Sequence, residues 1–382
     1  MTRTSPGSGR IDYLDSMRGL AALQVFISHF LHIHPAFDGP GSRADLPEGV
    51  VKWMAYSPLH LFWSGGEAVL FFFVLSGFVL SLPFFEDRAV PVLSFVIRRI
   101  FRIYWPYLAV TLISTLLLRW SLPLHPLEGL SEEWSGKWGR AVDGPEYLRL
   151  ILMRGDFTNL NSPAWSLVYE IRISVLIPLI CWVVRRAHPG WFLGGVVLFF
   201  FSVYHLQEPH LMKVSATINY GLYFFMGSWI AKERAGLVAL VDKWGRWGKI
   251  ALLVLALNLY VLAWEFPGLY GLLGTPNPMI HLTDLLTGLA AGALIVLALS
   301  SERMQAFLLH RPLLWLGRVS YSFYLIHLVI LLSAVYFLPH SWNLWVRASL
   351  GGLATLFLAE CSHRYLEVPS NRWGKRLAAK VG

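Results

Sequence analysis

Residues 14–31, LDSMRGLAALQVFISHFL, form an apolar run long enough to cross a membrane, and they contain the ionisable side chains of Arg18 and His29. Ionisable groups in such a run are costly to bury, so they usually face a protein cavity and mark a functional path. On an α-helix, eleven residues return a side chain to within about 20° of the same face, roughly 16 Å further along the axis. The spacing therefore predicts one helix that presents a cation near one mouth of a cavity and an imidazole deep inside it.

The composition places the chain among polytopic membrane proteins. Of its 382 residues, 55% are hydrophobic and only 14% are charged, whereas soluble domains carry about 25% charged residues. The excess of 32 Lys and Arg over 23 Asp and Glu fits cytoplasmic loops and anionic lipid headgroups better than nucleic acid. Cys181 and Cys361 both lie in apolar stretches, which argues against a disulfide framework or a zinc site.

The apolar runs predict an all-α fold, a polytopic transmembrane helical bundle of about ten spans. With the N-terminus inside, the inner segments carry more than twice as many Lys and Arg residues as the outer ones, so we expect both termini in the cytoplasm. We expect a cytoplasmic tail at 1–12, a transmembrane domain at 13–370 with an extracytoplasmic segment at 120–162, and a second cytoplasmic tail at 371–382. The expected spans are 13–33, 59–82, 97–119, 163–184, 191–206, 215–231, 249–265, 279–299, 318–337 and 344–363.

This topology brings an imidazole and two carboxylates to one depth. His29, Glu170 and Glu67 each fall about 10 Å below the outer surface of a core about 30 Å thick. A carboxylate beside an imidazole orients it and raises its basicity, which suits a general base that deprotonates an alcohol. A lone membrane histidine more often serves as a hydrogen-bonding residue between helices. With Arg18 on the same face and carboxylates at the same depth, the catalytic interpretation is favoured, and either carboxylate could be the partner.

Arginines gather on the predicted inner side. Arg98 and Arg102 are i,i+4 neighbours on one helix face, and Arg18 falls at the same level of the first span. Guanidinium groups near a cavity mouth suit bidentate phosphate binding. For Arg99 alone, an ordinary interfacial anchor is the better interpretation. For Arg18, a phosphate or a buried carboxylate is the better one.

Two further stretches could line a cavity. The run FFFVLSGF at 71–78 ends in a Ser76-Gly77 pair that permits close approach of a neighbouring helix or of an elongated ligand, and helix packing is favoured. His327 falls near mid-membrane, with Tyr324 three residues earlier on the same face. For His327, a structural hydrogen bond and a place in the cavity wall have equal weight.

Six motifs occur in the order found in the membrane-bound acyltransferase 3 family, which the chain resembles over nearly its whole length. Each motif is weak alone, but the set is specific. They are LDSMRGLAAL (14–23) followed by His29, FFFVLSGF (71–78), the Arg98-x3-Arg102 pair, WSLVYE (165–170), YSFYLIH (321–327) and RYLEVP (364–369).

The resemblance implies an integral-membrane enzyme that transfers acyl groups, most often acetyl, from a cytoplasmic thioester to extracytoplasmic hydroxyls. Acceptors in the family include O-antigen, exopolysaccharide, Nod factors, peptidoglycan and some antibiotics. His29 is then the catalytic histidine, Arg18 its motif partner, and Glu170 part of the WSLxxE pattern. Ile171 and Arg172 depart from the residues usual after that glutamate.

We therefore expect an O-acyltransferase of the bacterial inner membrane that uses acyl-CoA as donor substrate and acts on a cell-envelope carbohydrate. No metal and no permanently bound cofactor are expected. A transporter or flippase of a lipid-linked sugar or anionic solute is the alternative, although no inverted repeat is visible. The expected catalytic residues are His29, Glu170 and Glu67; the donor contacts are Arg18, Arg98, Arg102, Ser76 and Phe73; the acceptor contacts are Trp165, Tyr324 and His327.

Overall fold

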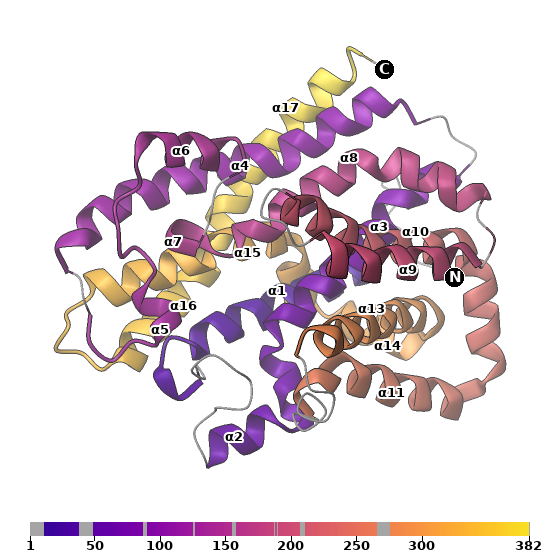
Figure 1. Ribbon diagram of the computed structural model, residues 1–382, viewed down its shortest axis with the longest axis horizontal. Helices are drawn as coiled ribbons and strands as arrows, with labels where there is room; N and C mark the ends of the chain where they lie inside the picture. The colour runs from indigo at the N-terminus through magenta and orange to yellow at the C-terminus, as the bar shows by residue number, and fades with distance from the viewer. Residues whose placement is uncertain are drawn as a thin grey trace. The chain divides into compact units, whose positions relative to one another are not determined.

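The computed structural model describes residues 11–37, 49–86, 90–124, 127–154, 158–186, 188, 190–206, 211–265 and 276–381. These residues form helices and no strand, which confirms the all-helical prediction. The helices are α1 (Asp12–Leu31), α2 (Val50–Ala55), α3 (Gly65–Phe85), α4 (Val92–Ser121), α5 (Glu132–Ser135), α6 (Gly144–Ile151), α7 (Thr158–Asn161), α8 (Ala164–Arg186), α9 (Gly190–His205), α10 (Met212–Lys243), α11 (Gly245–Glu265), α13 (Pro276–Ser300), α14 (Glu302–Leu308), α15 (Arg311–Phe337), α16 (Leu344–Ser362) and α17 (Val368–Ala378), with 3₁₀ turns η1 (Pro35–Phe37), η2 (Pro58–Trp63) and η3 (Leu122–Leu124) and a π-helical turn η4 (His363–Glu367) (Figure 1).

Seven helical stretches of the described chain are long and apolar enough to cross a membrane, and each overlaps an expected span. The expected spans at 13–33 and 215–231 are also helical, as α1 and α10, and the span at 191–206 corresponds to α9 with its short apolar stretch Gly194–Val203. The chain is thus a multi-pass membrane protein. The count of ten spans and the cytoplasmic location of the termini stay predictions.

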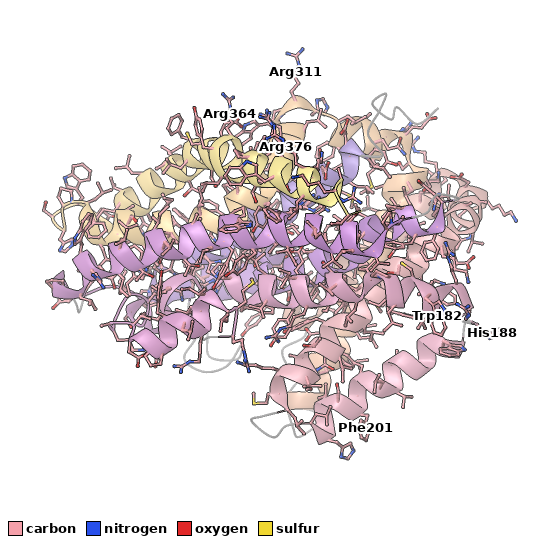
Figure 2. The ribbon with its side chains drawn as sticks, turned by 90° about the horizontal axis from the view of Figure 1, so that it is seen from above. Trp182, His188, Phe201, Arg311, Arg364 and Arg376 are labelled. Atoms are coloured by element: carbon pink, nitrogen blue, oxygen red, sulfur yellow. The ribbon has the colours of Figure 1, made fainter. Side chains whose placement is uncertain are left out.

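Large apolar side chains cover the outer faces of several long helices. Trp182 on α8 and Phe201 on α9 point away from the helices that carry them (Figure 2) and are 53% and 52% exposed. Trp120, Leu353 and Phe357 are exposed to a still greater degree. Apolar surface on this scale is disfavoured in water, whereas lipid chains and the membrane interface accept it. The exposed faces therefore agree with the hydropathy of the spans.

The chain forms two compact units. The first comprises the described parts of 1–21, 56–92 and 172–318, and the second those of 22–55, 93–171 and 319–382. Helices α1, α8 and α15 have residues in both units.

In the first unit, α10 packs against α3, α9 and α13, and α13 packs against α3 and α11 (Figure 1). The contact between α3 and α10 is made by small residues. A Cβ on Gly77 would overlap the carbonyl oxygen of Phe224, and one on Gly227 would overlap the carbonyl oxygen of Val74. Small residues at such crossings let two backbones touch. The packing interpretation of the FFFVLSGF run is confirmed at Gly77.

In the second unit, α15 is the central element. Phe26 of α1 packs against Phe323 of α15, with ring centroids 5.3 Å apart. Arg347 of α16 donates a hydrogen bond to the carbonyl oxygen of Val335 on α15 at 2.7 Å. The Tyr321 hydroxyl of α15 donates to the carbonyl oxygen of Ile103 on α4 at 2.7 Å. Helix α17 also contacts α4. The predicted tail at 371–382 begins within α17, and Ser94 of α4 donates to the carbonyl oxygen of Ala378 at 2.8 Å.

The crossing of α3 and α10 can be tested with two substitutions on the same helix. Gly227→Ala forces the helices apart because the new methyl group meets backbone, and overpacking of this kind costs about 1–3 kcal/mol. Gly221→Ala is the control, because nothing lies within 4 Å of its added Cβ. We expect a clearly lower thermal unfolding midpoint in detergent for Gly227→Ala and an unchanged one for Gly221→Ala. Equal midpoints would mean that the close crossing is not needed for stability.

Candidate active site

The candidate site lies in the second unit. It is built from the C-terminal half of α1, the C-terminal half of α15, the segment 127–163, and the first turns of α8. The centre of the arrangement is a pair of histidines, His29 on α1 and His327 on α15.

The hydrogen bonds of the two rings fix which nitrogen carries a proton. Nδ1 of His327 lies 2.7 Å from the carbonyl oxygen of Tyr324, so this nitrogen carries hydrogen and Nε2 is an acceptor. Nδ1 of His29 lies 2.9 Å from the carbonyl oxygen of Val25 and 3.3 Å from Nε2 of His327. Both neighbours are acceptors, so Nδ1 of His29 donates and its Nε2 holds the lone pair.

The two imidazoles differ in burial and in hydrogen bonding. Among the described residues Nε2 of His29 has no hydrogen-bond partner, and the side chain is only partly buried. His327, by contrast, is fully buried and packs against Phe323 and Phe26, with ring centroids 6.4 and 6.2 Å away. The first imidazole therefore keeps one ring nitrogen without a hydrogen-bond partner in the described part of the chain, and the second holds it in place.

A carboxylate in the segment between α4 and α8 interacts electrostatically with His29. Glu133 on α5 interacts electrostatically with His29 and His32, and it accepts a hydrogen bond from Nζ of Lys137 at 2.5 Å. Burial raises the pKa of Glu133, but the charge and hydrogen bond of Lys137, followed by the two histidines, outweigh burial and lower the pKa below its ordinary value. The carboxylate is thus ionised at neutral pH.

Hydrogen bonds dock this segment onto the helices. Ser131 donates from its hydroxyl to the carbonyl oxygen of His32 at 2.6 Å and from its backbone to that of Ile33 at 3.0 Å. Tyr336 of α15 donates to the carbonyl oxygen of Lys137 at 3.1 Å. The buried Trp138 donates to Ser114 of α4 at 3.1 Å. Glu133 therefore belongs to a well-anchored part of the unit.

The sequence analysis did not identify Glu133 as a site residue. A carboxylate in a polar segment resembles any solvated loop charge, and only the docking of the segment places it near His29. One weak signal was present, since the segment contains Trp134 and Trp138, both of which are fully buried.

Glu170 pairs with a different group from the one expected. Its Oε1 accepts a hydrogen bond from the guanidinium of Arg99 at 2.8 Å, and the two side chains are 23% and 8% exposed. The interpretation of Arg99 as an ordinary interfacial anchor is therefore wrong, because it forms a largely buried ion pair. Loss of one partner from such a pair typically costs about 3–5 kcal/mol. The orientation of His29 comes from a backbone carbonyl and a second imidazole rather than from Glu170.

Tyrosines of α15 connect the histidines to this ion pair. The Tyr324 hydroxyl lies 2.8 Å from the Ser166 hydroxyl and donates to the carbonyl oxygen of Pro163 at 3.1 Å. Tyr324 also interacts electrostatically with Glu170. Trp165 lies one residue before Ser166, half-buried, with its ring 6.1 Å from that of Tyr169. The predicted acceptor contacts Trp165, Tyr324 and His327 thus belong to one region.

The two arginines of the Arg-x3-Arg pair differ in environment. Arg98 is exposed and donates from Nε to the carbonyl oxygen of Ser94 in its own helix at 3.1 Å. Arg102 is partly buried and interacts electrostatically with Tyr321, as do Arg99 and Glu170. The side chain of Arg98 is therefore accessible to a molecule in solution, whereas Arg102 is directed toward the polar group of Tyr321.

Four expected site residues belong to the first unit. Arg18 forms an ion pair with Asp15 at 2.8 Å, so a half-buried carboxylate is one of its partners. Glu67 is buried and interacts electrostatically with Tyr260 of α11.

The last two of the four are buried in α3. Phe73 packs with its ring 5.0 Å from that of Tyr220, and Ser76 is 6% exposed. Their assignment to the donor stays a prediction. In neither unit do three or more His, Cys, Asp or Glu side chains of the described chain gather to hold a metal ion.

Comparison with known proteins identifies the family. A family model described as an acyltransferase domain, acyltransferase 3, matches residues 11–359. Acyltransferase MdmB of Streptomyces mycarofaciens is 26% identical over 367 residues, which cover 92% of this chain and 87% of that protein. No solved structure matches the chain. The match extends from α1 into α16 and includes both histidines, the Arg99–Glu170 pair and Glu133. The chain belongs to the acyltransferase 3 family and is an acyltransferase.

Proposed function

We propose that this enzyme transfers an acyl group, in the simplest case acetyl, from cytoplasmic acyl-CoA to a hydroxyl of an extracytoplasmic carbohydrate such as O-antigen, exopolysaccharide or another cell-envelope glycan. The observation that carries the proposal is the tautomer of His29, in which Nδ1 donates to the Val25 carbonyl oxygen and to His327 and Nε2 keeps its lone pair. An imidazole in this state is the general base that alcohol acylation requires. The enzyme is assigned to the bacterial cytoplasmic membrane.

In the proposed reaction, Nε2 of His29 accepts the hydroxyl proton while the hydroxyl oxygen attacks the thioester carbonyl carbon. The tetrahedral adduct collapses, the carbon–sulfur bond breaks, and the imidazolium returns its proton to the departing thiolate of coenzyme A. The negative charge of Glu133 stabilises the imidazolium that forms during attack. Direct transfer is favoured because no serine or cysteine hydrogen-bonds to His29 in the described residues. A transient acyl-histidine is the variant mechanism.

On the donor side, Arg98 and Arg102 are proposed to bind the phosphates of acyl-CoA, since guanidinium groups pair well with phosphate oxygens. The exposure of Arg98 supports such a contact. Arg18, Ser76 and Phe73 are assigned to the donor from the family resemblance. On the acceptor side, His327 and Tyr324 are assigned because His327 contacts His29 and Tyr324 contacts His327. Trp165 is assigned because it precedes Ser166, which hydrogen-bonds to Tyr324.

The central test replaces the base. His29→Ala removes the proton acceptor, and general bases of this kind contribute about 10²- to 10⁴-fold to rate. We expect transfer of radiolabelled acetyl groups from acetyl-CoA to envelope glycans to fall by at least 100-fold, with the thermal unfolding midpoint little changed. His205→Ala is the control, since that histidine is exposed at the end of α9. Near-normal transfer by His29→Ala would remove this residue from the mechanism.

A second test concerns the charge of Glu133. Since its pKa lies below the ordinary value, the carboxylate is ionised throughout the neutral range and favours a protonated imidazole at His29. Glu133→Gln removes that charge, so the acid limb of the acylation pH profile should move to lower pH while the maximal rate falls. The shift should be modest, a few tenths of a pH unit, because the side chain is 43% exposed and solvent screens it.

The matched control for that test is Glu132→Gln, which removes an exposed carboxylate from the preceding position of α5. It should leave the profile unchanged. A shift to higher pH in Glu133→Gln, or equal shifts in both variants, would contradict the assigned role of Glu133.

A further inference from the structure

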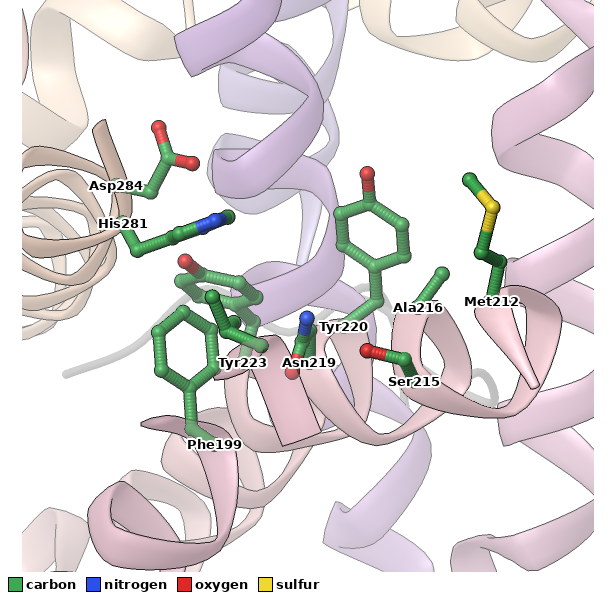
Figure 3. Close-up of a pocket in the computed structure, with 10 residues that line it drawn as sticks. Phe199, Met212, Ser215, Ala216, Asn219, Tyr220, Tyr223, His281 and Asp284 are labelled. Atoms are coloured by element: carbon green, nitrogen blue, oxygen red, sulfur yellow. The ribbon is translucent and has the colours of Figure 1, made fainter. Parts of the chain in front are cut away.

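A separate cavity of about 480 Å³ lies in the first unit, between α9, α10 and α13 (Figure 3). This volume is in the range of small-molecule sites, about 300–1,000 Å³. None of the residues assigned to the acyl-transfer reaction lines it.

One wall of the cavity is aromatic. Tyr220 and Tyr223 project from one face of α10, and Phe199 of α9 meets Tyr223 edge to face with ring centroids 6.5 Å apart. Tyr220 also packs against Phe73 of α3, whose ring centroid lies 5.0 Å away. The negative faces of such rings attract the slightly positive C–H groups of a pyranose ring. The packing keeps this surface in place without a ligand.

Groups that can hydrogen-bond lie beside the aromatic side chains (Figure 3). The Asn219 carbonyl oxygen accepts a hydrogen bond from Ser202, and its amide nitrogen, which lines the cavity, has no hydrogen-bond partner among the described residues (Figure 3). His281 of α13 packs against Phe199 at 5.9 Å, and its ring nitrogens have no hydrogen-bond partner among the described residues. Asp284 lies one turn further along α13 and interacts electrostatically with Tyr223.

The charge of the lining selects the class of ligand. The described residues around the cavity include no Lys or Arg, so a phosphate or coenzyme A has no cationic partner there. The donor hydrogens of Asn219 oppose a cationic ligand, although Asp284 and the aromatic rings would favour one. Aromatic rings combined with an amide, an imidazole and a carboxylate match a neutral polyhydroxylated ring.

The cavity lies at the end of the helices where α9 leads into α10. Its residues come from the C-terminal part of α9, the N-terminal half of α10 and the beginning of α13. In the predicted topology with the N-terminus inside, this end is the extracytoplasmic one. A glycan can reach it without entering the cytoplasm.

We infer that this cavity binds one pyranose ring of a neutral saccharide, with Tyr220 as the stacking surface and Asn219 and His281 as hydrogen-bonding groups. That the saccharide is the acyl acceptor rests on the proposed function; that the cavity binds saccharide does not.

Binding is tested by saturation-transfer difference NMR on the full chain in detergent. The probes are the methyl glycosides of glucose, galactose, rhamnose and N-acetylglucosamine, with acyclic sorbitol as the control probe. At least one glycoside should receive saturation at the C–H groups of one ring face, and sorbitol should not. His281→Phe keeps the ring and its contact with Phe199 but removes both nitrogens, and Tyr220→Leu removes the stacking surface. Each should weaken binding about three- to tenfold, the loss expected for one hydrogen bond or one stacking contact.

His205→Phe, outside the cavity, is the matched control and should bind as the native protein does. Thermal unfolding midpoints identify any variant that fails to fold. If one cavity variant does not fold, the other alone suffices for the comparison. Absence of binding by all four glycosides, binding unaffected by both cavity variants, or binding of tetramethylammonium in their place would overturn the inference.

The link to acyl transfer is measured separately. In an active preparation, His281→Phe should raise KM for the glycan acceptor with KM for acyl-CoA unchanged. Glycoside binding should persist in His29→Ala. If binding occurs but no acyl group reaches any glycan, the proposed function fails and the saccharide site stands. If glycans are acylated and the KM for the acceptor is unchanged in both cavity variants, the proposed function stands and the saccharide bound in the cavity is not the acyl acceptor.

Discussion

The proton on Nδ1 of His29 is the constraint on which the candidate site depends. A neutral imidazole is a base at one nitrogen only when its other nitrogen keeps the hydrogen, and here two acceptors hold that hydrogen. One is the carbonyl oxygen of Val25, which any helix supplies four residues back. The other is His327, and it can accept only because Tyr324 takes the hydrogen of its own Nδ1. The tautomer of His29, the candidate base, is thus set in part by the backbone carbonyl of Tyr324, three residues before His327.

This dependence explains why the YSFYLIH motif carries so many polar groups on a membrane helix. The backbone carbonyl of Tyr324 accepts a hydrogen bond from His327, and its hydroxyl contacts that of Ser166. The hydroxyl of Tyr321 donates to a backbone carbonyl of α4. Each polar group buried in a low-dielectric interior is costly without a partner. Their partners come from α4 and α8 as well as α1. The motif therefore fixes the packing of these helices and the geometry of His29 with the same bonds.

The sequence predicted the features that depend on one helix at a time. Apolar runs predicted the helices, and the position of His29 in α1 identified the candidate base. Pairings between helices were harder, because equal depth in a membrane does not determine which faces meet. Glu170 was placed at the level of His29, but its side chain faces Arg99 of α4. Glu133 escaped notice because its neighbourhood exists only after α5 has docked on the end of α1.

The RYLEVP motif was recognised by resemblance alone, and the structure gives it a physical role. Pro369 has no N–H and cannot continue the α-helical hydrogen-bond pattern. The helix widens just before it, and the N–H of Val368 donates to the carbonyl oxygen of His363, five residues back. Such π-helical turns often occur at functional sites.

The wider turn decides where the buried carboxylate of Glu367 points. It accepts hydrogen bonds from Ser322 of α15 at 3.0 Å and from His363 at 2.9 Å. The π-helical turn contains one residue more than an α-helical turn. In a regular α-helix the Glu367 side chain would therefore lie about 100° further around the helix axis, away from Ser322. Since Ser322 lies between Tyr321 and Tyr324 on α15, the proline-induced turn at the end of α16 supports the same helix that holds His327. The distant motif thus acts on the site through the packing of α15 rather than through chemistry of its own.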